Sequence, residues 1–315
     1  MTINKQVTAI APASVANVGA GFDIVGFALE GTGDRVTLTL DENGNNDDVI
    51  NSGPFGSLIP ASRLQNTAGV AVDAFLTATG RREVAIRINL EKNLPLGSGL
   101  GSSASSSAAA VYAANVLLGN LLNVDQLVQF AMEGERIACG TAHADNVAPS
   151  LLGGFVLIRS YDPLDLIRIK CPEDLFCAVV HPHIELKTSD ARRILKRDIP
   201  IGDVIKQTAN SAAFIAGLIS GDYDLIGRSM TDLVAEPKRT QLIPGFIQAK
   251  KAAMDSGALG CGISGSGPSV FALCRGGETA WRISEAVKNS FSTEGLESEG
   301  YVSTLNAPGA GIVEL

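Results

Sequence analysis

The sequence of 315 residues predicts an α+β protein with two domains. Single domains usually contain about 100–200 residues, so the length accommodates two of them. Hydrophobic residues make up 45% of the chain and charged residues 18%, which is enough apolar material for a large core and excludes disorder over most of the chain. Segments with the alternation of strands are mixed with segments of helical spacing, and several predicted strands follow one another without a helix between them. That order favours α+β over a doubly wound sheet.

The individual elements follow from these two periodicities. In the first half they are a strand at 35–40, a solvated polar loop at 41–48, a helix at 61–79, a strand at 84–90 and helices at 103–118 and 124–139. Beyond them come strands at 155–158, 166–169, 176–180, 259–263, 269–274 and 301–305, and helices at 189–195, 201–219, 223–233, 246–256 and 279–289. Two prolines bracket a short predicted strand within 161–172, and we expect the domains to cover 1–165 and 166–315.

Charge and cysteine content exclude several classes of function. The 25 Lys and Arg residues are outnumbered by 33 Asp and Glu, giving a net charge of -8 that argues against nucleic acid or an anionic membrane as a partner. The five cysteines show no CxxC spacing, which suits a reducing compartment. The N-terminal segment lacks the apolar run of about 7–15 residues that a signal peptide needs. We therefore expect a cytoplasmic protein.

The strongest motif is the glycine-rich segment Pro95-Leu96-Gly97-Ser98-Gly99-Leu100-Gly101-Ser102-Ser103-Ala104. Glycine at every second position allows a positive φ and a close approach of the backbone to a ligand. The segment leads into a predicted helix, whose first N–H groups and positive dipole end suit a phosphate group. The Lys-Ser or Lys-Thr of a P-loop is absent, and an ordinary turn before a helix is the alternative interpretation.

A second group of polar residues is Glu135 followed by His143-Ala144-Asp145-Asn146. These hydrogen-bonding side chains lie close together in a segment otherwise rich in alanine and glycine. A carboxylate such as Glu135 could hold Mg²⁺, which takes one or two carboxylates together with substrate phosphates. The alternative is a solvated carboxylate and a structural histidine, at about even odds.

Two further segments are dense in small residues. One runs from Gly260 to Ser269 and predicts a tight turn or a loop that closes over a ligand. The other runs from Pro12 to Asp23, where a strand ends in small residues and presents Asn17 and Asp23. Each of them alone is typical of a plain turn.

Taken together, three of these segments carry a family resemblance. In chain order, 17–23, 95–104 and 260–269 resemble the three signature motifs of the GHMP small-molecule kinases. Within that superfamily, 11–23, 143–149 and Glu236-Pro237-Lys238-Arg239 are similar to the members that phosphorylate the side-chain hydroxyl of L-homoserine on the route to threonine. The resemblance covers nearly the whole chain.

The resemblance implies a fold, a set of ligands and a set of site residues. The fold would be an N-terminal domain with a left-handed βαβ unit and a ferredoxin-like C-terminal domain, and the protein would use ATP and Mg²⁺ and form a homodimer. The nucleotide would contact Asn66, Pro95, Leu96, Gly97, Ser98, Gly99, Leu100, Gly101, Ser102 and Ser103. Mg²⁺ would lie at Ser103 and Glu135. Homoserine would contact Asn17, Asp23, His143, Asp145, Asn146, Arg192 and Arg239, with Asn17, Asp23, Asp145 and Asn146 as the candidates for catalysis.

The chemistry of a zwitterion supports that substrate set. Arg192 and Arg239 suit a carboxylate, because a guanidinium group can pair with it in a bidentate manner. Asp23 and Asp145 could accept hydrogen bonds from the ammonium group, and Asn17 and Asn146 could orient the hydroxyl, although the sequence does not divide these roles. Some superfamily kinases place an aspartate base where this chain has Asn146, so catalysis is expected to rest on positioning and charge neutralisation.

Three alternatives remain open at this point. His181 and His183, with His143 and Asp145, could form a zinc site of a hydrolase, although two histidines beside a proline are more often structural. The fold could also serve a non-catalytic ligand sensor. A kinase of the same superfamily that acts on mevalonate or a sugar is the third alternative, which the paired acidic and basic side chains disfavour because those substrates lack an ammonium group.

Overall fold

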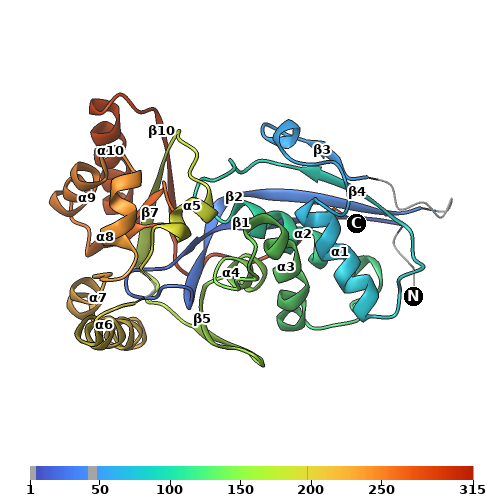
Figure 1. The fold of residues 1–315 in the computed structure, drawn as a ribbon, viewed down its shortest axis with the longest axis horizontal. Helices are drawn as coiled ribbons and strands as arrows, with labels where there is room; N and C mark the ends of the chain where they lie inside the picture. The colour runs from blue at the N-terminus through green and yellow to red at the C-terminus, as the bar shows by residue number, and fades with distance from the viewer. Residues whose placement is uncertain (1–4, 42–47, 197, 315) are drawn as a thin grey trace.

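The computed structural model describes residues 5–41, 48–196 and 198–314 of the chain. It confirms an α+β fold, which is organised around two sheets (Figure 1). Residues 42–47 of the polar loop predicted at 41–48 lie outside the described residues.

The first sheet has seven strands and forms the N-terminal lobe. Five of its strands pair in the order β11-β1-β2-β4-β3. Strand β5 also pairs with β2, and β6 pairs with β5. The strands are β1 (Gln6–Ala16), β2 (Val25–Leu40), β3 (Ile50–Ser52), β4 (Ile86–Glu91), β5 (Phe155–Tyr161), β6 (Leu164–Ile169) and β11 (Gly311–Glu314). Because β1 and β2 pair antiparallel over their length, residues 17–24 form the connection between them.

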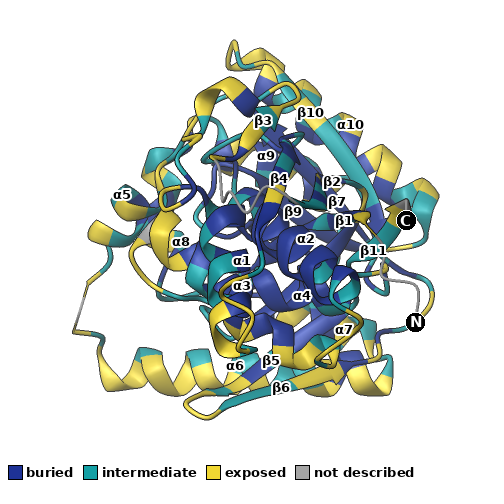
Figure 2. Ribbon diagram, turned by 90° about the vertical axis from the view of Figure 1, so that its right-hand side faces the viewer, coloured by how far each residue is buried: buried dark blue, intermediate teal, exposed yellow. Residues whose placement is uncertain are grey.

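Four helices of the N-terminal lobe complete it: α1 (Thr67–Ala78), α2 (Ser102–Leu117), α3 (Val124–Cys139) and α4 (Val147–Leu152). Helices α2 and α4 pack against β1 and β2. Helix α2 is buried on almost every side (Figure 2), which its alanines and serines permit because small side chains let neighbouring backbones approach closely. Helix α1 begins at Thr67 and not at the predicted 61, because the Asn66 side chain accepts from the Ala68 amide and caps the helix there.

The second sheet is antiparallel, runs in the order β10-β7-β9-β8 and forms the C-terminal lobe together with six α-helices of the described residues. Its strands are β7 (Leu175–Pro182), β8 (Gly260–Ile263), β9 (Val270–Arg275) and β10 (Ser298–Thr304). The helices are α5 (Thr188–Arg193), α6 (Ile201–Ser220), α7 (Tyr223–Arg228), α8 (Glu236–Arg239), α9 (Phe246–Asp255) and α10 (Gly277–Thr293). This strand order and the helix between β9 and β10 match the expected ferredoxin-like arrangement.

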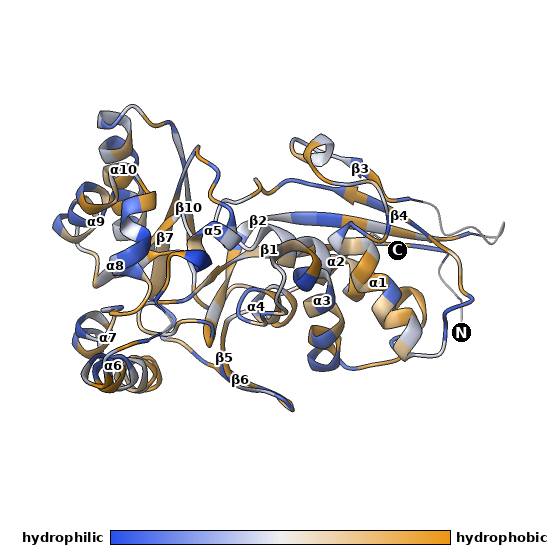
Figure 3. Ribbon diagram, in the orientation of Figure 1, coloured by the Kyte–Doolittle hydropathy of each residue, from blue (hydrophilic) through white to orange (hydrophobic). Residues whose placement is uncertain are grey.

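Both faces of the second sheet are covered, so β7 is hydrophobic along most of its length (Figure 3). Ala178 and Val180 belong to a core shared with α9 and α10. Cys177 and Val179 point to the opposite face, as successive residues of a strand must, and belong to a core that includes α6, α7, β2 and β5. The two lobes therefore share one apolar core and meet without a free linker.

Two expectations from the sequence differ from the structure: the position of the domain boundary relative to β6 and the end of one predicted helix. The expected boundary between 165 and 166 falls inside β6, which pairs with β5 from Phe155 to Tyr161, so the first sheet extends to Ile169. The helix predicted at 223–233 ends at Arg228. None of the helices in the described part of the chain is long and apolar enough to cross a membrane.

Candidate active site

A cavity of about 350 Å³ lies between the two lobes. Most of the predicted site residues line it, namely Asn17, Asp23, Leu96, Gly97, Ser98, Gly99, Gly101, Ser102, Ser103, Glu135, His143, Asp145, Asn146, Arg192 and Arg239. Three predicted nucleotide contacts are not among the lining residues: Asn66 caps α1, Pro95 begins the glycine-rich turn, and Leu100 is fully buried in the shared core. The predicted residues that line the cavity therefore come from segments that are far apart in the sequence.

The glycine loop, defined here as residues 95–101, runs from the region after β4 to the first turn of α2. Gly97, Gly99 and Gly101 have φ values of 58°, 77° and 65°, a backbone region that side chains with a Cβ rarely adopt. A Cβ on Gly101 would lie 2.1 Å from Ser14 Oγ. Glycine is therefore required at this end of the loop by both conformation and space.

Four successive carbonyl groups of the glycine loop bond to neighbouring segments. Those of Gly97 and Ser98 accept from the amides of Leu186 (3.0 Å) and Ser269 (3.1 Å). Those of Gly99 and Leu100 accept from Ser264 Oγ (2.6 Å) and the Ser14 amide (3.0 Å), respectively.

The amide groups of the same loop are the ones left for a ligand. Within the described ranges, no acceptor bonds to the amide N–H groups of Gly97, Ser98, Gly99 or Gly101. These residues line the cavity, and the N-terminal end of α2 lies beside them. Unpaired amides at a helix N-terminus attract an anion, and a phosphate group fits that description.

Ser103 and Glu135 meet at the start of α2. The Ser103 hydroxyl donates to Glu135 Oε2 at 2.6 Å, and the Glu135 side chain is 8% exposed. A hydroxyl and a carboxylate beside a phosphate site are oxygen donors of the kind that Mg²⁺ takes together with phosphate oxygens. The donor set thus fits the metal that the resemblance implies.

Gly265 is the point at which three predicted segments converge. Its carbonyl accepts from Asn17 Nδ2 at 3.0 Å and from Arg239 Nη1 at 2.7 Å, and its amide donates to the Ala16 carbonyl at 2.9 Å. Asn17 also uses its Oδ1, which accepts from the Asp23 amide at 2.7 Å. The amide side chain of Asn17 therefore holds the first and third motifs together.

Asp23 forms an ion pair with Arg192. The guanidinium contacts both carboxylate oxygens at 2.9–3.2 Å, so the two groups expected to bind opposite ends of a zwitterion bind each other. His143 Nδ1 lies 3.9 Å from Asp23 Oδ1, and burial lowers the pKa of this imidazole. Tyr161, which the sequence argument missed, donates from its hydroxyl to the Asp23 carbonyl at 2.7 Å and accepts from the Ala144 amide at 3.3 Å.

Asp145 is the second carboxylate of the cavity, and its environment differs from that of Asp23. Its side chain is 3% exposed, and its Oδ1 has no hydrogen-bond partner within the described residues. Burial, reinforced by the negative charges of Asp23 and Glu135, raises the pKa of Asp145 to about 7. A buried carboxylate oxygen without a partner is a strong acceptor for a ligand cation.

Two cavity residues are held in place by hydrogen bonds within the protein. Asn146 Oδ1 accepts from Ser14 Oγ at 2.9 Å, and Asn146 precedes the first residue of α4. Arg239 is 2% exposed and donates to the carbonyls of Gly265 and Ala191. Burial lowers the pKa of Arg239 from its ordinary value.

Glu185, Lys187, Thr188 and Ser189 also line the cavity, although none of them was predicted as a site residue. Ser266 lines it as well and belongs to the predicted segment 260–269. Glu185 and Lys187 lie between β7 and α5, and Thr188 and Ser189 are the first residues of α5. This segment has no motif, and a lysine or a glutamate in such a segment is ordinarily solvated. Thr188 Oγ1 lies 3.3 Å from Ser266 Oγ across the cavity wall. The one signal in the sequence that could have indicated these residues is their position next to the predicted helix at 189–195, which contains Arg192.

The zinc site considered from sequence does not form. The described ranges hold no group of three or more His, Cys, Asp or Glu side chains that could bind a metal ion. His181 is buried and its Nδ1 lies 3.3 Å from Ser269 Oγ, while His183 Nδ1 lies 3.7 Å from Glu297 Oε2. These contacts give both histidines structural partners.

Comparisons with known proteins agree with this geometry. The models of the GHMP kinases N terminal domain and of the GHMP kinases C terminal domain match residues 66–154 and 214–293. The homoserine kinase of Chlorobium phaeobacteroides is 51% identical over 98% of this chain and 100% of that protein. The homoserine kinase of Arabidopsis thaliana is 42% identical over 98% of this chain and 85% of that protein. The crystal structure of homoserine kinase from Cytophaga hutchinsonii superposes with a TM-score of 0.95 at 47% identity and covers 99% of each chain.

Proposed function

Since the chain belongs to the homoserine kinase family, we propose that it transfers the γ-phosphoryl group of ATP to the side-chain hydroxyl of L-homoserine. The products are ADP and O-phospho-L-homoserine, an intermediate on the route to threonine. The observation that carries the proposal is one cavity in which an anion-binding loop faces the side chains that suit an amino acid.

The phosphate end of ATP would lie on the glycine loop. The amides of Gly97, Ser98, Gly99 and Gly101 and the N-terminus of α2 supply donors and a positive field for it. Ser103 and Glu135 would hold Mg²⁺. When bound, that ion neutralises charge that develops on the phosphate oxygens. Asn66 remains the predicted contact near the adenine, and it lies at the N-terminus of α1.

The amino-acid end of the cavity would recognise the zwitterion. Asp145 is the better of the two acceptors for the ammonium group, because Asp23 already pairs with Arg192 while Asp145 Oδ1 lacks a partner among the described residues. Arg239 would bind the substrate carboxylate. Arg192 and Asp23 would contribute as a pair, with His143 beside them.

The reacting hydroxyl would be oriented by Asn17 and Asn146. It attacks the γ-phosphorus in line, a new O–P bond forms, and the bond to the oxygen that bridges the β- and γ-phosphates breaks as ADP leaves. An asparagine amide cannot take up a proton at neutral pH, so the hydroxyl proton passes to an oxygen of the transferred phosphoryl group. Catalysis then rests on positioning and on neutralisation of a loose transition state, without a dedicated carboxylate base.

The test is ADP production by the purified protein with Mg·ATP and a panel of acceptors. L-Homoserine, L-serine, mevalonate, galactose and no acceptor are compared. Turnover with L-homoserine and with no other compound is expected. Turnover with mevalonate or galactose alone would contradict the roles given to Asp145 and Arg239, and ATP binding without turnover on any acceptor would favour the ligand-sensor interpretation.

The expected homodimer stays a prediction. Helix α6 presents the exposed side chains of Ile201, Ile205 and Ile219, and it is the first surface to examine for a contact between two copies. Sedimentation velocity at micromolar concentration would distinguish a monomer from a dimer.

A further inference from the structure

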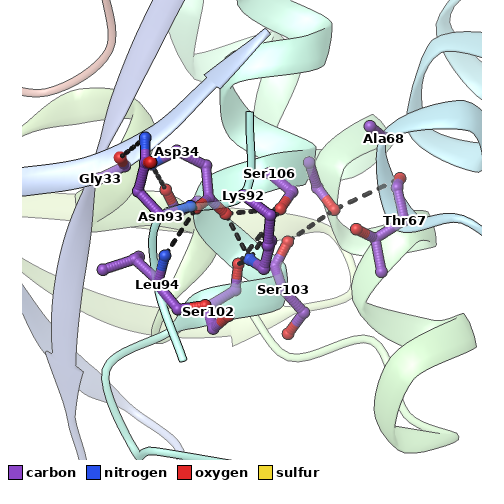
Figure 4. Close-up of polar contacts among 12 residues, drawn as sticks. Gly33, Asp34, Thr67, Ala68, Lys92, Asn93, Leu94, Ser102, Ser103 and Ser106 are labelled. Carbon is purple, nitrogen blue, oxygen red and sulfur yellow. Dashed lines mark hydrogen bonds and ion pairs between the residues drawn. The ribbon is translucent and has the colours of Figure 1, made fainter. Parts of the chain in front are cut away.

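Lys92 and Asp34 form an ion pair beneath the glycine loop (Figure 4). Their side chains are 2% and 0% exposed, and neither residue lines the cavity. Burial lowers the pKa of Lys92, and the Asp34 carboxylate opposes that effect. A buried ion pair is often no more stabilising than apolar side chains of the same size, so stability alone does not explain why charges stand here.

The Asp34 carboxylate, which comes from the middle of β2, holds the beginning of the glycine loop. Its Oδ1 accepts from the amide of Asn93 at 2.9 Å and from the amide of Leu94 at 3.1 Å. These two residues directly precede Pro95. The entry of the chain into the loop is thus fixed by two hydrogen bonds to a charged acceptor, which are stronger than bonds between neutral groups.

The other half of the pair holds the end of the loop. Lys92 Nζ donates to the Ser102 carbonyl at 2.6 Å and to Ser106 Oγ at 3.0 Å, and both acceptors belong to the first turns of α2. Ser106 Oγ in turn donates to Asp34 Oδ2 at 2.6 Å. One pair of charges is therefore connected to both ends of the segment whose amides face the cavity.

The opposite charges of Lys92 and Asp34 indicate that the pair positions the backbone and does not attract the ligand. A cation at the N-terminal end of a helix opposes the helix dipole, and Asp34 cancels that charge at close range. The pair carries no net charge, so it is not an additional phosphate-binding cation. What it supplies is a fixed separation between Leu94 and Ser102.

We propose that the Lys92–Asp34 pair is a positioning element of the nucleotide site. It holds the two ends of the glycine loop so that the loop amides point at the phosphate groups, and it does so without touching the ligand. The inference rests on the proposed function in one respect, since it takes the glycine loop to bind the phosphates of ATP.

The first test removes one hydroxyl from the network. Ser106→Ala deletes the group that contacts both Lys92 and Asp34, and it should raise the Kd of Mg·ATP, measured by calorimetry without homoserine, by about tenfold. Ser107→Ala is the matched control, because Ser107 is also buried on α2 but donates to the Ser103 carbonyl at 3.0 Å and not to the pair. Its Kd should stay within about twofold of the wild type. Equal Kd values for Ser106→Ala and the wild type would overturn the proposal.

The second test separates positioning from folding. Lys92→Met alone leaves a buried carboxylate without its cation and should lower Tm sharply. Adding Asp34→Asn removes the unpaired charge while keeping an oxygen for the amides of Asn93 and Leu94, so the double variant should regain most of that Tm. Its Kd for Mg·ATP should remain raised at least about tenfold, with the Ser102 carbonyl no longer held.

A double variant with the wild-type Tm and the wild-type Kd would reduce the pair to a structural role and overturn the inference. The wild type is assayed for turnover with homoserine in the same series. Failure of that turnover with normal ATP binding would count against the proposed function alone, because the Kd is measured without homoserine. Failure of the wild type to bind Mg·ATP would overturn both.

Discussion

The raised pKa of Asp145 predicts a specific dependence of activity on pH. If its carboxylate binds the substrate ammonium, only the ionised enzyme binds homoserine well. With a pKa of about 7, close to nine-tenths of the enzyme is ionised at pH 8 and close to one-tenth at pH 6. The value of kcat/KM for homoserine should therefore fall about tenfold between pH 8 and pH 6, because this ratio reports ionisations of the free enzyme.

The value of kcat should behave differently. At saturating homoserine the bound ammonium keeps Asp145 ionised, and a reaction without a carboxylate base has no further group to titrate near neutrality. We expect kcat to change by no more than about twofold over the same range. The assay is steady-state ADP production at saturating Mg·ATP with homoserine varied at each pH.

Asp145→Asn is the control for this assignment. It should lower kcat/KM at pH 8 by about tenfold to a hundredfold, the effect of losing a hydrogen bond to a charged group, and flatten the profile. A profile of kcat/KM that is flat in the wild type would refute the assignment of Asp145. A kcat that falls in parallel with kcat/KM would refute the mechanism without a base.

The same burial predicts the pH dependence of stability, with a definite sign. The folded pKa of Asp145 is raised from 3.8 to about 7, so its contribution to stability is fully present below about pH 4 and is lost as the pH rises through 7. Three pKa units correspond to about 4 kcal/mol as an upper limit. Asp145→Asn should therefore increase the free energy of unfolding at pH 8 and change it little near pH 4, as urea titrations at the two pH values would measure.

Three further substitutions test other parts of the site. Gly101→Ala should lower Tm and raise KM for ATP more than Gly80→Ala. Both positions have a positive φ (65° and 67°), which costs about 1–2 kcal/mol for alanine, but a Cβ collides with Ser14 only at Gly101. Equal effects of the two substitutions in thermal unfolding would contradict the steric argument. Asn146→Ala should lower kcat about a hundredfold with no steep loss toward low pH, since the amide orients the hydroxyl and takes no proton. Tyr161→Phe should raise KM for homoserine about fivefold and leave KM for ATP unchanged, because it removes the hydroxyl that bridges the Asp23 and Ala144 backbones. A change in KM for ATP instead would show that this bridge supports another part of the cavity.

Some of the long elements were predictable from their periodicity. The helix at 124–139 begins and ends as expected, because Asn123 and Gln126 form a capping box and Gly140 ends it with a positive φ. The short elements β3, α4, α8 and β11 were missed, since three to six residues carry too little of either period.

The end of α7 shows how one side chain can override a helical pattern. Asp232 accepts from the amides of Val234, Ala235 and Glu236, and these bonds compete with those that a longer helix would make. The helix predicted at 223–233 therefore stops at Arg228, and a new short helix begins at Glu236. The sequence contains the aspartate but does not say which backbone it will bond.

The site residues also fall into two groups, those that a local sequence motif predicts and those that depend on partners far away in the sequence. The glycine loop could be predicted because three glycines at alternate positions are rare outside a special backbone conformation. Tyr161 and Lys92 could not, because a tyrosine or lysine at the end of a strand has no local feature that separates a site residue from a surface residue. Their roles depend on partners that lie far away in sequence, such as Asp23 for Tyr161 and Asp34 for Lys92.

The hydrogen bonds of the glycine loop also explain why the proposed nucleotide site and the proposed amino-acid site cannot be separate modules. The carbonyls of Gly97, Ser98 and Gly99 accept from Leu186, Ser269 and Ser264, all from the C-terminal lobe. The lobe that carries Arg192 and Arg239 therefore also orients the amides that we propose to bind phosphate. A shift of the C-terminal lobe would therefore rotate the peptide groups of the loop and move both arginines at once. Because phosphoryl transfer depends on alignment of the two reactants more than on any single catalytic group, this coupling places the donor and the acceptor under one mechanical constraint. The network around Lys92 and Asp34 fixes the ends of the same loop from the other side, which leaves the loop little freedom to adapt to a displaced phosphate.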